Sequence, residues 1–144
     1  MIFRTVLAIS AIAIGITAAV AQQDPIAACR AAMKAIGAQA GQGAKFMKGE
    51  EPFDLAKAQA IFVTYATNAA AAANLFPESS KDGDTAALPV IWEKNADFKA
   101  KMAKFVAEAK DAQGKVTDET SFKAMFPEVA KNCGGCHADY RKRT

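Results

Sequence analysis

Apolar residues recur at intervals of three and four positions along almost the whole chain after residue 24, in four separate segments. This spacing places the apolar side chains on one face of an α-helix, and no segment shows the alternation that is typical of a β-strand. Each helix must bury its apolar face against the others. The pattern therefore predicts an all-α fold, an antiparallel up-down-up-down four-helix bundle. The expected helices span 25–48, 54–75, 90–113 and 118–142.

Residues that begin and end helices support these boundaries. Asp24 before Pro25 and Asp54 after the Gly49–Phe53 connection are suitable N-terminal caps, because a carboxylate accepts hydrogen bonds from the free N–H groups of a first turn. Gly114 is expected to end the third helix. Pro127 is expected to kink or split the fourth, because proline has no N–H to continue the hydrogen bonding.

The last predicted helix contains the motif Cys133-Gly134-Gly135-Cys136-His137. Two thiols at this spacing can add to the two vinyl groups of one haem, and the adjacent imidazole is placed to bind its iron. Both cysteines fall on the apolar face of the helix, so the haem is expected to face the core. The motif predicts one covalent haem c.

Other uses of such cysteines fit less well. A structural zinc needs four ligands, and beyond the motif only Cys29 remains. A thioredoxin-like redox pair needs a βαβ setting that the sequence lacks. A structural disulfide does not explain why the one histidine of the chain follows the second cysteine. Cys29 itself is interpreted as a small apolar core residue, with a reactive thiol as the alternative.

The second axial ligand can be sought among the methionines, since His137 is the only histidine. In an up-down-up-down bundle the end of the fourth helix lies beside the start of the first. At about 1.5 Å per residue, Met33 then lies at the level of His137, whereas Met125 is roughly 18 Å away along its own helix. Met47 lies at the far end, and Met102 is favoured as a core residue. Met33 is the predicted distal ligand.

The first 21 residues have the pattern of a secretory signal: a basic Arg4, an apolar stretch, and the small residues Ala19 and Ala21 at a cleavage site. An uncleaved membrane anchor is the alternative. The segment predicts export to the periplasm and a mature domain of residues 22–144. This length suits one domain, and a formal net charge of only +3 argues against nucleic acid binding.

Several segments resemble the class II c-type cytochromes, particularly the cytochromes c-556 and c-554. The resemblance covers essentially the whole mature chain. It implies thioether bonds from Cys133 and Cys136, ligation of iron by His137 and Met33, and a role near the haem for Arg141. Members often carry an arginine four residues before the distal position, where this chain has Cys29. The segments that carry the resemblance are Met33–Gly37, Lys48–Asp54, Leu75–Pro77, Pro89–Trp92 and Cys133–Arg141.

Two functions are compatible with these observations. The favoured one is a periplasmic electron carrier, not an enzyme, that exchanges electrons with membrane-bound or soluble redox proteins. The resemblance to the cytochromes c' implies the alternative, a five-coordinate haem protein that binds nitric oxide or carbon monoxide. A methionine at the distal position favours the carrier. Class II relatives also include dimers, so a homodimer is possible.

Overall fold

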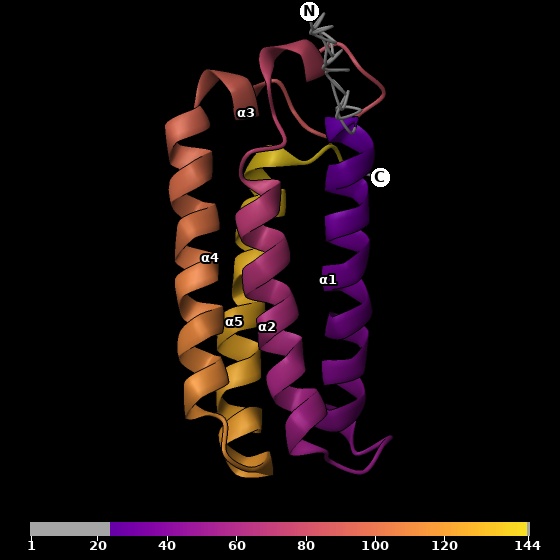
Figure 1. The fold of residues 1–144 in the computed structure, drawn as a ribbon, viewed down its shortest axis with the longest axis vertical. Coiled ribbons are helices and arrows are strands. Elements are labelled where there is room, and N and C mark those ends of the chain that lie inside the picture. Colours follow the sequence, from indigo (N-terminus) through magenta and orange to yellow (C-terminus); the bar gives the residue numbers. More distant parts are fainter. Residues whose placement is uncertain (1–23, 144) are drawn as a thin grey trace, which may run out of the picture.

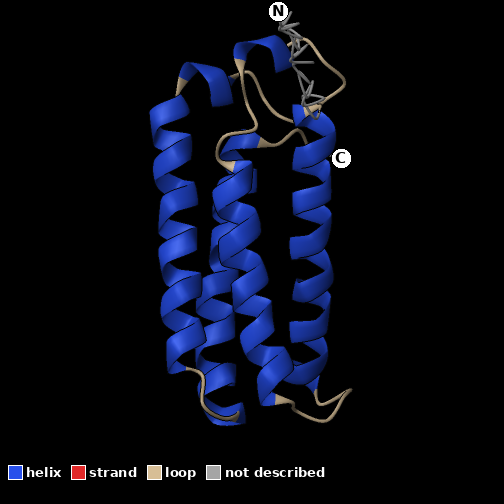
Figure 2. Cartoon of the chain, viewed as in Figure 1, coloured by secondary structure: helices blue, strands red, loops and turns tan. Residues whose placement is uncertain are grey.

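A computed structural model describes residues 24–143, and these residues are almost entirely helical (Figures 1 and 2). The predicted signal segment lies outside the described residues. A short helix and a 3₁₀ turn cover one end of the molecule, and the described residues contain no strand beyond an isolated bridge between Ala87 and Arg141. The elements in chain order are α1 (Pro25–Lys48), α2 (Leu55–Ala72), η1 (Glu78–Ser80), α3 (Val90–Glu93), α4 (Asn95–Lys115) and α5 (Glu119–Tyr140).

The four long helices form the antiparallel up-down-up-down bundle that the sequence predicts. Successive long helices run in opposite directions along the long axis of the molecule (Figure 1). Helix α2 packs against α1 and α4, α4 packs against α5, and α5 returns to contact α1. None of the helices within residues 24–143 is both long enough and apolar enough to cross a membrane.

Local sequence begins and ends these helices largely as expected. The carboxylates of Asp24 and Asp54 accept hydrogen bonds from backbone N–H groups in the first turns of α1 and α2. Asp118 and Ser121 form a reciprocal capping box at the start of α5. Helix α1 ends at Lys48, and the next residue, Gly49, caps it with a φ of 71°, a left-handed conformation that glycine adopts without a steric penalty.

The predicted third helix was wrong in two respects. It divides at Lys94 into the short α3 and the long α4, because long-range contacts hold α3: the Trp92 indole N–H donates to the Pro77 carbonyl, and its ring packs edge-on against Phe76. Its end was also misplaced, since α4 continues through Gly114. A glycine inside a helix costs about 1 kcal/mol, and that cost does not outweigh the packing of α4.

The ends of the second and fourth helices also differ from the prediction. Helix α2 ends at Ala72 rather than at residue 75, and α5 ends at Tyr140 rather than at 142. Helix α5 runs unbroken through Pro127. The prediction was that Pro127 would kink or split this helix, and the split does not occur, because the flanking Phe126 and Val129 are buried and hold both turns in the core.

A cluster of aromatic rings fills the half of the core that is remote from α3. Phe122 of α5 lies at its centre, with ring centroids of four other phenylalanines between 5.1 and 6.0 Å from its own. Burying one such side chain contributes roughly 1.5–3 kcal/mol, and each aromatic pair adds about 0.5–1.5 kcal/mol. The cluster therefore anchors α5 firmly against α1 and α2. The four partners of Phe122 are Phe46, Phe53, Phe62 and Phe126.

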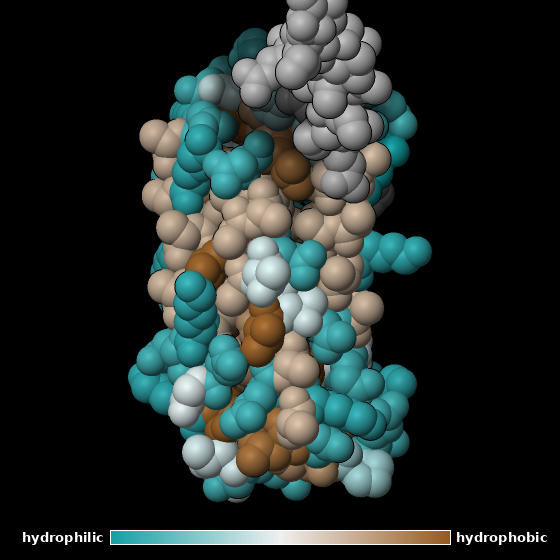
Figure 3. Space-filling model, in the orientation of Figure 1, coloured by the Kyte–Doolittle hydropathy of each residue, from teal (hydrophilic) through white to brown (hydrophobic). Residues whose placement is uncertain are grey.

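The outer surface is mixed in character. In the view of Figure 3, weakly apolar side chains spread across the middle of the molecule, and hydrophilic ones gather most densely toward its lower end. This pattern follows from the alanine-rich sequence of α2. Leu55 and Val63 are the large apolar side chains of the described residues that are exposed, at 38% and 43%.

Gly43 allows α1 to approach α5 closely, and this contact gives a first prediction. A Cβ atom at Gly43 would lie 2.2 Å from Cε2 of Phe126, whereas a Cβ at Gly41 would have nothing within 4 Å. We expect Gly43→Ala to lower the free energy of unfolding by about 1–3 kcal/mol through overpacking. Gly41→Ala is expected to raise it, because alanine favours the helix by up to about 1 kcal/mol. Chemical unfolding followed by circular dichroism measures the free energy of unfolding of both variants. Equal changes in Gly43→Ala and Gly41→Ala would contradict the proposed contact between α1 and Phe126.

Candidate functional site

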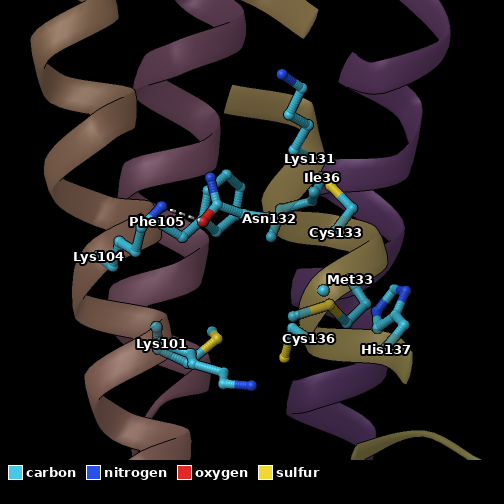
Figure 4. Close-up of a pocket in the computed structure, with 12 residues that line it drawn as sticks. Met33, Ile36, Lys101, Lys104, Phe105, Lys131, Asn132, Cys133, Cys136 and His137 are labelled. Atoms are coloured by element: carbon cyan, nitrogen blue, oxygen red, sulfur yellow. Dashed lines mark hydrogen bonds between the residues drawn. The ribbon is translucent and has the colours of Figure 1, made fainter. Parts of the chain in front are cut away.

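An apolar pocket of about 300 Å³ lies between α1, α4 and α5 (Figure 4). It brings the CxxCH motif of α5 together with side chains from two other helices. The residues that line it are Met33 and Ile36 of α1, Lys101, Met102, Lys104 and Phe105 of α4, and Lys131, Asn132, Cys133, Gly135, Cys136 and His137 of α5.

Cys133, Cys136 and His137 share one face of α5, since residues three and four apart are neighbours on a helix. Both thiols are half-buried, and burial raises the pKa of each above its ordinary value. They are therefore neutral thiols at neutral pH. The prediction that these cysteines face the interior is met only in part, because they lie at the wall of the pocket and His137 lies at its more exposed edge.

The imidazole of His137 is in the form that can bind a metal. Burial, and to a smaller extent the positive charge of Arg141, lowers its pKa below the ordinary value. The ring is therefore neutral at neutral pH and has a nitrogen lone pair available.

Met33 lines the same pocket from α1, opposite the motif. Figure 4 shows Met33, Cys136 and His137 at one level of the pocket, as helix geometry predicted. Of the other methionines, Met102 also lines the pocket but is a core residue with 4% exposure. Met47 and Met125 pack against the core away from the pocket.

The predicted residues outside the pocket have other surroundings. Arg141 does not line it, although its charge acts on His137. Arg30, which follows Cys29 in the chain and was not a predicted site residue, makes an exposed ion pair with Asp84 at 2.9 Å. Cys29 is half-buried and lies outside the core cluster, so its interpretation as a core residue was too strong. Burial raises the pKa of the Cys29 thiol, which is therefore neutral at neutral pH.

Four polar residues at the pocket were missed by the sequence analysis. Lys101 and Lys104 of α4 and Lys131 and Asn132 of α5 line its edge. Lys101 forms an ion pair with Asp139. The spacing of Lys101 and Lys104 beside the apolar stripe of α4 could have placed them at its border, but not at this pocket.

The pocket fits a c-type haem. It has two half-buried thiols at the attachment spacing, one neutral imidazole beside them and the sulfur of Met33 on the facing helix. Gly135 leaves open space, because a Cβ there would meet nothing within 4 Å. A zinc site fits less well, since within residues 24–143 no three His, Cys, Asp or Glu side chains are grouped to hold a metal ion. The fold and pocket together define a haem protein of the c type.

Comparison with known proteins assigns the family. The family model described as Cytochrome C' matches residues 24–141. A cytochrome c' of Rhodopseudomonas palustris is 44% identical over 126 residues, which cover 87% of this chain and 86% of the relative. A cytochrome c-556 of Agrobacterium fabrum is 41% identical over 110 residues, which cover 76% of this chain and 75% of the relative. The chain therefore belongs to the cytochrome c' family, and it is a monohaem c-type cytochrome with covalent haem c as its cofactor.

Solved structures agree with this assignment. Cytochrome c' from Rhodopseudomonas palustris superposes with a TM-score of 0.80 at 41% identity, over 85% of this chain and 99% of that one. A structural model of oxidized cytochrome c556 from the same organism gives a TM-score of 0.77 at 30% identity. The superposition again covers 85% of this chain and 99% of that one. The four-helix bundle is confirmed, and relatives of both kinds have it.

The positions of the three cysteines give a second prediction. We expect Cys29→Ala to keep its full content of covalent haem, because Cys29 does not line the pocket. Cys133→Ala and Cys136→Ala should each lose at least half of the covalent haem content, since each variant lacks one of the two attachment points. Mass spectrometry of the denatured proteins measures the attached haem. Loss of haem from Cys29→Ala would contradict the assignment.

Proposed function

We propose that the protein is a periplasmic electron carrier whose haem iron has His137 and Met33 as axial ligands. The main support is the position of Met33 in the pocket that also holds Cys133, Cys136 and His137. A methionine sulfur is a soft ligand that suits haem iron in electron-transfer proteins.

Each residue of the site has a distinct part in this proposal. Haem c supplies an iron that alternates between Fe(III) and Fe(II). Cys133 and Cys136 hold the cofactor on α5 by two thioethers, and His137 offers a neutral imidazole from the same face. Met33 offers its sulfur from α1, which favours Fe(II) and raises the reduction potential.

The bundle supports repeated electron transfer because it holds the two axial ligands on separate, firmly packed helices. Helix α5 is anchored by Phe122, and α1 by Phe46 and the close approach at Gly43. Met33 and His137 fixed in this way would stay in place in both oxidation states of the haem, so little rearrangement would accompany each transfer. With two protein ligands on the iron, no position would remain for a substrate, and the proposal is therefore a carrier rather than an enzyme.

A five-coordinate protein that binds nitric oxide or carbon monoxide is the second candidate. Two observations favour it: the 44% identity to a protein named cytochrome c', and a solved nitric oxide complex of a cytochrome c prime variant from Alcaligenes xylosoxidans at 26% identity. In this case Met33, which is half-buried and packs against the core, would fill space without binding iron.

Replacement of Met33 distinguishes the two functions. We expect the wild-type ferrous protein to give a low-spin spectrum that carbon monoxide leaves unchanged. Met33→Ala opens one axial position, so its spectrum should become high-spin and respond to carbon monoxide. Met125→Leu is the matched control, because it changes a methionine outside the pocket. A wild-type protein that readily binds carbon monoxide would contradict the carrier.

Export is part of the same proposal and has its own test. We expect the mature protein to begin near Gln22, after the small residues that precede it, and to occur in the periplasmic fraction. Mass spectrometry of the purified protein identifies its first residue. A haem-containing protein that retains residues 1–21 would support the membrane anchor instead.

A further inference from the structure

An open groove of about 380 Å³ lies between α2 and α4 on the outer surface. Its apolar lining consists of short side chains from both helices, among them Ala70 and Ala73 of α2 and Ala103 and Val106 of α4. Val63, which is 43% exposed, lies two turns before Ala70 on the same face of α2 and extends this apolar surface. The weakly apolar side chains in the middle of Figure 3 lie over the same two helices.

Met102 connects this groove with the haem pocket. Its side chain lines both spaces, and it is buried with 4% exposure. Met102 is therefore a wall that the groove and the pocket share. A redox group seated on the groove would come close to the haem without entering its pocket, and electron transfer is faster over shorter distances.

Two positively charged side chains border the groove. Lys99 and Lys110 are exposed and are separated by three turns of α4, roughly 17 Å along the axis. Neither lysine takes part in any of the ion pairs formed within residues 24–143. The other lysines of α4, Lys101, Lys104 and Lys115, each pair with a carboxylate. The positive charge of the groove is thus left uncompensated.

The edge of the haem pocket has lysines of a different kind. Lys101, Lys104 and Lys131 line it, and each of them has a carboxylate partner within 4 Å. The field of an ion pair falls off faster with distance than the field of a single charge. A negatively charged protein is therefore attracted more strongly to the groove between α2 and α4 than to this edge.

We propose that the groove is the docking site for an acidic electron-transfer protein, whose carboxylates pair with Lys99 and Lys110 and whose apolar centre covers the alanines between them. This inference rests on the proposed function as an electron carrier. An apolar centre with a polar rim is the usual anatomy of an interface, and a small contact area suits a transient redox encounter. In each encounter the reduced partner loses one electron, and the haem Fe(III) gains it and becomes Fe(II).

A second copy of this chain fits the groove less well. In a two-fold symmetric contact the same surface of each copy meets the other. Lys99 and Lys110 of one copy would then approach the same two lysines of the other copy. Like charges placed together at an interface are destabilising, whereas an acidic partner supplies the missing opposite charge.

Charge reversal at the groove of the haem-loaded protein tests the proposal. The probe is reduced flavodoxin, an acidic protein that carries electrons on FMN, and stopped-flow absorbance measures the rate constant at which it reduces the ferric haem. We expect Lys99→Glu/Lys110→Glu to lower this rate constant by about tenfold or more at low salt, because complementary charges speed the encounter. The difference from the wild type should shrink as ionic strength rises.

Matched variants separate the groove from the rest of the surface. Lys34→Glu/Lys57→Glu makes the same change of net charge at exposed, unpaired lysines outside the groove and the pocket, and we expect a much smaller loss. Ala103→Trp fills the groove without changing its charge and should also slow reduction. Ala124→Trp, at an exposed position of α5 outside both spaces, should not. Redox titration verifies that the midpoint potential is the same in all of these proteins.

Several results would overturn the docking site. Equal losses in Lys34→Glu/Lys57→Glu and in the groove variant would do so, and a larger loss in Lys104→Glu/Lys131→Glu would place docking at the edge of the haem pocket instead. Self-association of the wild-type protein that is lost in the groove variant, or binding of the groove to phosphatidylglycerol vesicles, would also overturn it. Sedimentation measures both.

Nuclear magnetic resonance distinguishes failure of the docking site from failure of the carrier function. Oxidized flavodoxin should shift the amide signals of the groove residues without any electron transfer, and shifts confined to other surfaces would contradict the docking site. If the groove signals shift but the wild-type haem binds carbon monoxide and flavodoxin does not reduce it, the docking site stands and the proposed carrier function fails.

Discussion

The apolar pocket between α1, α4 and α5 is the constraint on which the rest of the structure depends. Its lining is largely apolar and comes from three different helices. Such a lining suits the flat apolar face of a haem held by Cys133 and Cys136, because apolar surfaces are stabilised when they cover one another. The rest of the bundle must therefore hold α1, α4 and α5 at the spacing that this pocket requires.

The two halves of the bundle divide these tasks. Around Phe122, aromatic rings pack closely and hold α5 against its neighbours. Three turns further along the same helix, Cys133 begins the motif that lines the pocket. Because one continuous helix contains both, the anchored half fixes the height and rotation of the haem-binding half. Tyr65 lies where the two halves meet, and its hydroxyl is the polar atom that the aromatic packing leaves unsatisfied.

The sequence predicted features with local causes and missed those with distant ones. Asp24 and Asp54 cap helices through their own neighbours, so the starts of α1 and α2 could be predicted. The break at Lys94 depends on the Trp92 hydrogen bond to Pro77, which is remote in sequence. Helix rise placed Met33 level with His137, but the rotation of α4 that brings Lys101 to the pocket follows from packing and has no sequence signal.

The bond between Met33 sulfur and iron is the central claim, because it separates a carrier from a gas-binding relative. Iron K-edge X-ray absorption of the wild-type protein, in the ferric and ferrous states, tests it most directly. The account predicts one sulfur neighbour of iron in both states, in addition to five nitrogens. Iron with nitrogen neighbours alone in either state would contradict it and would make Met33 a packing residue of a five-coordinate site.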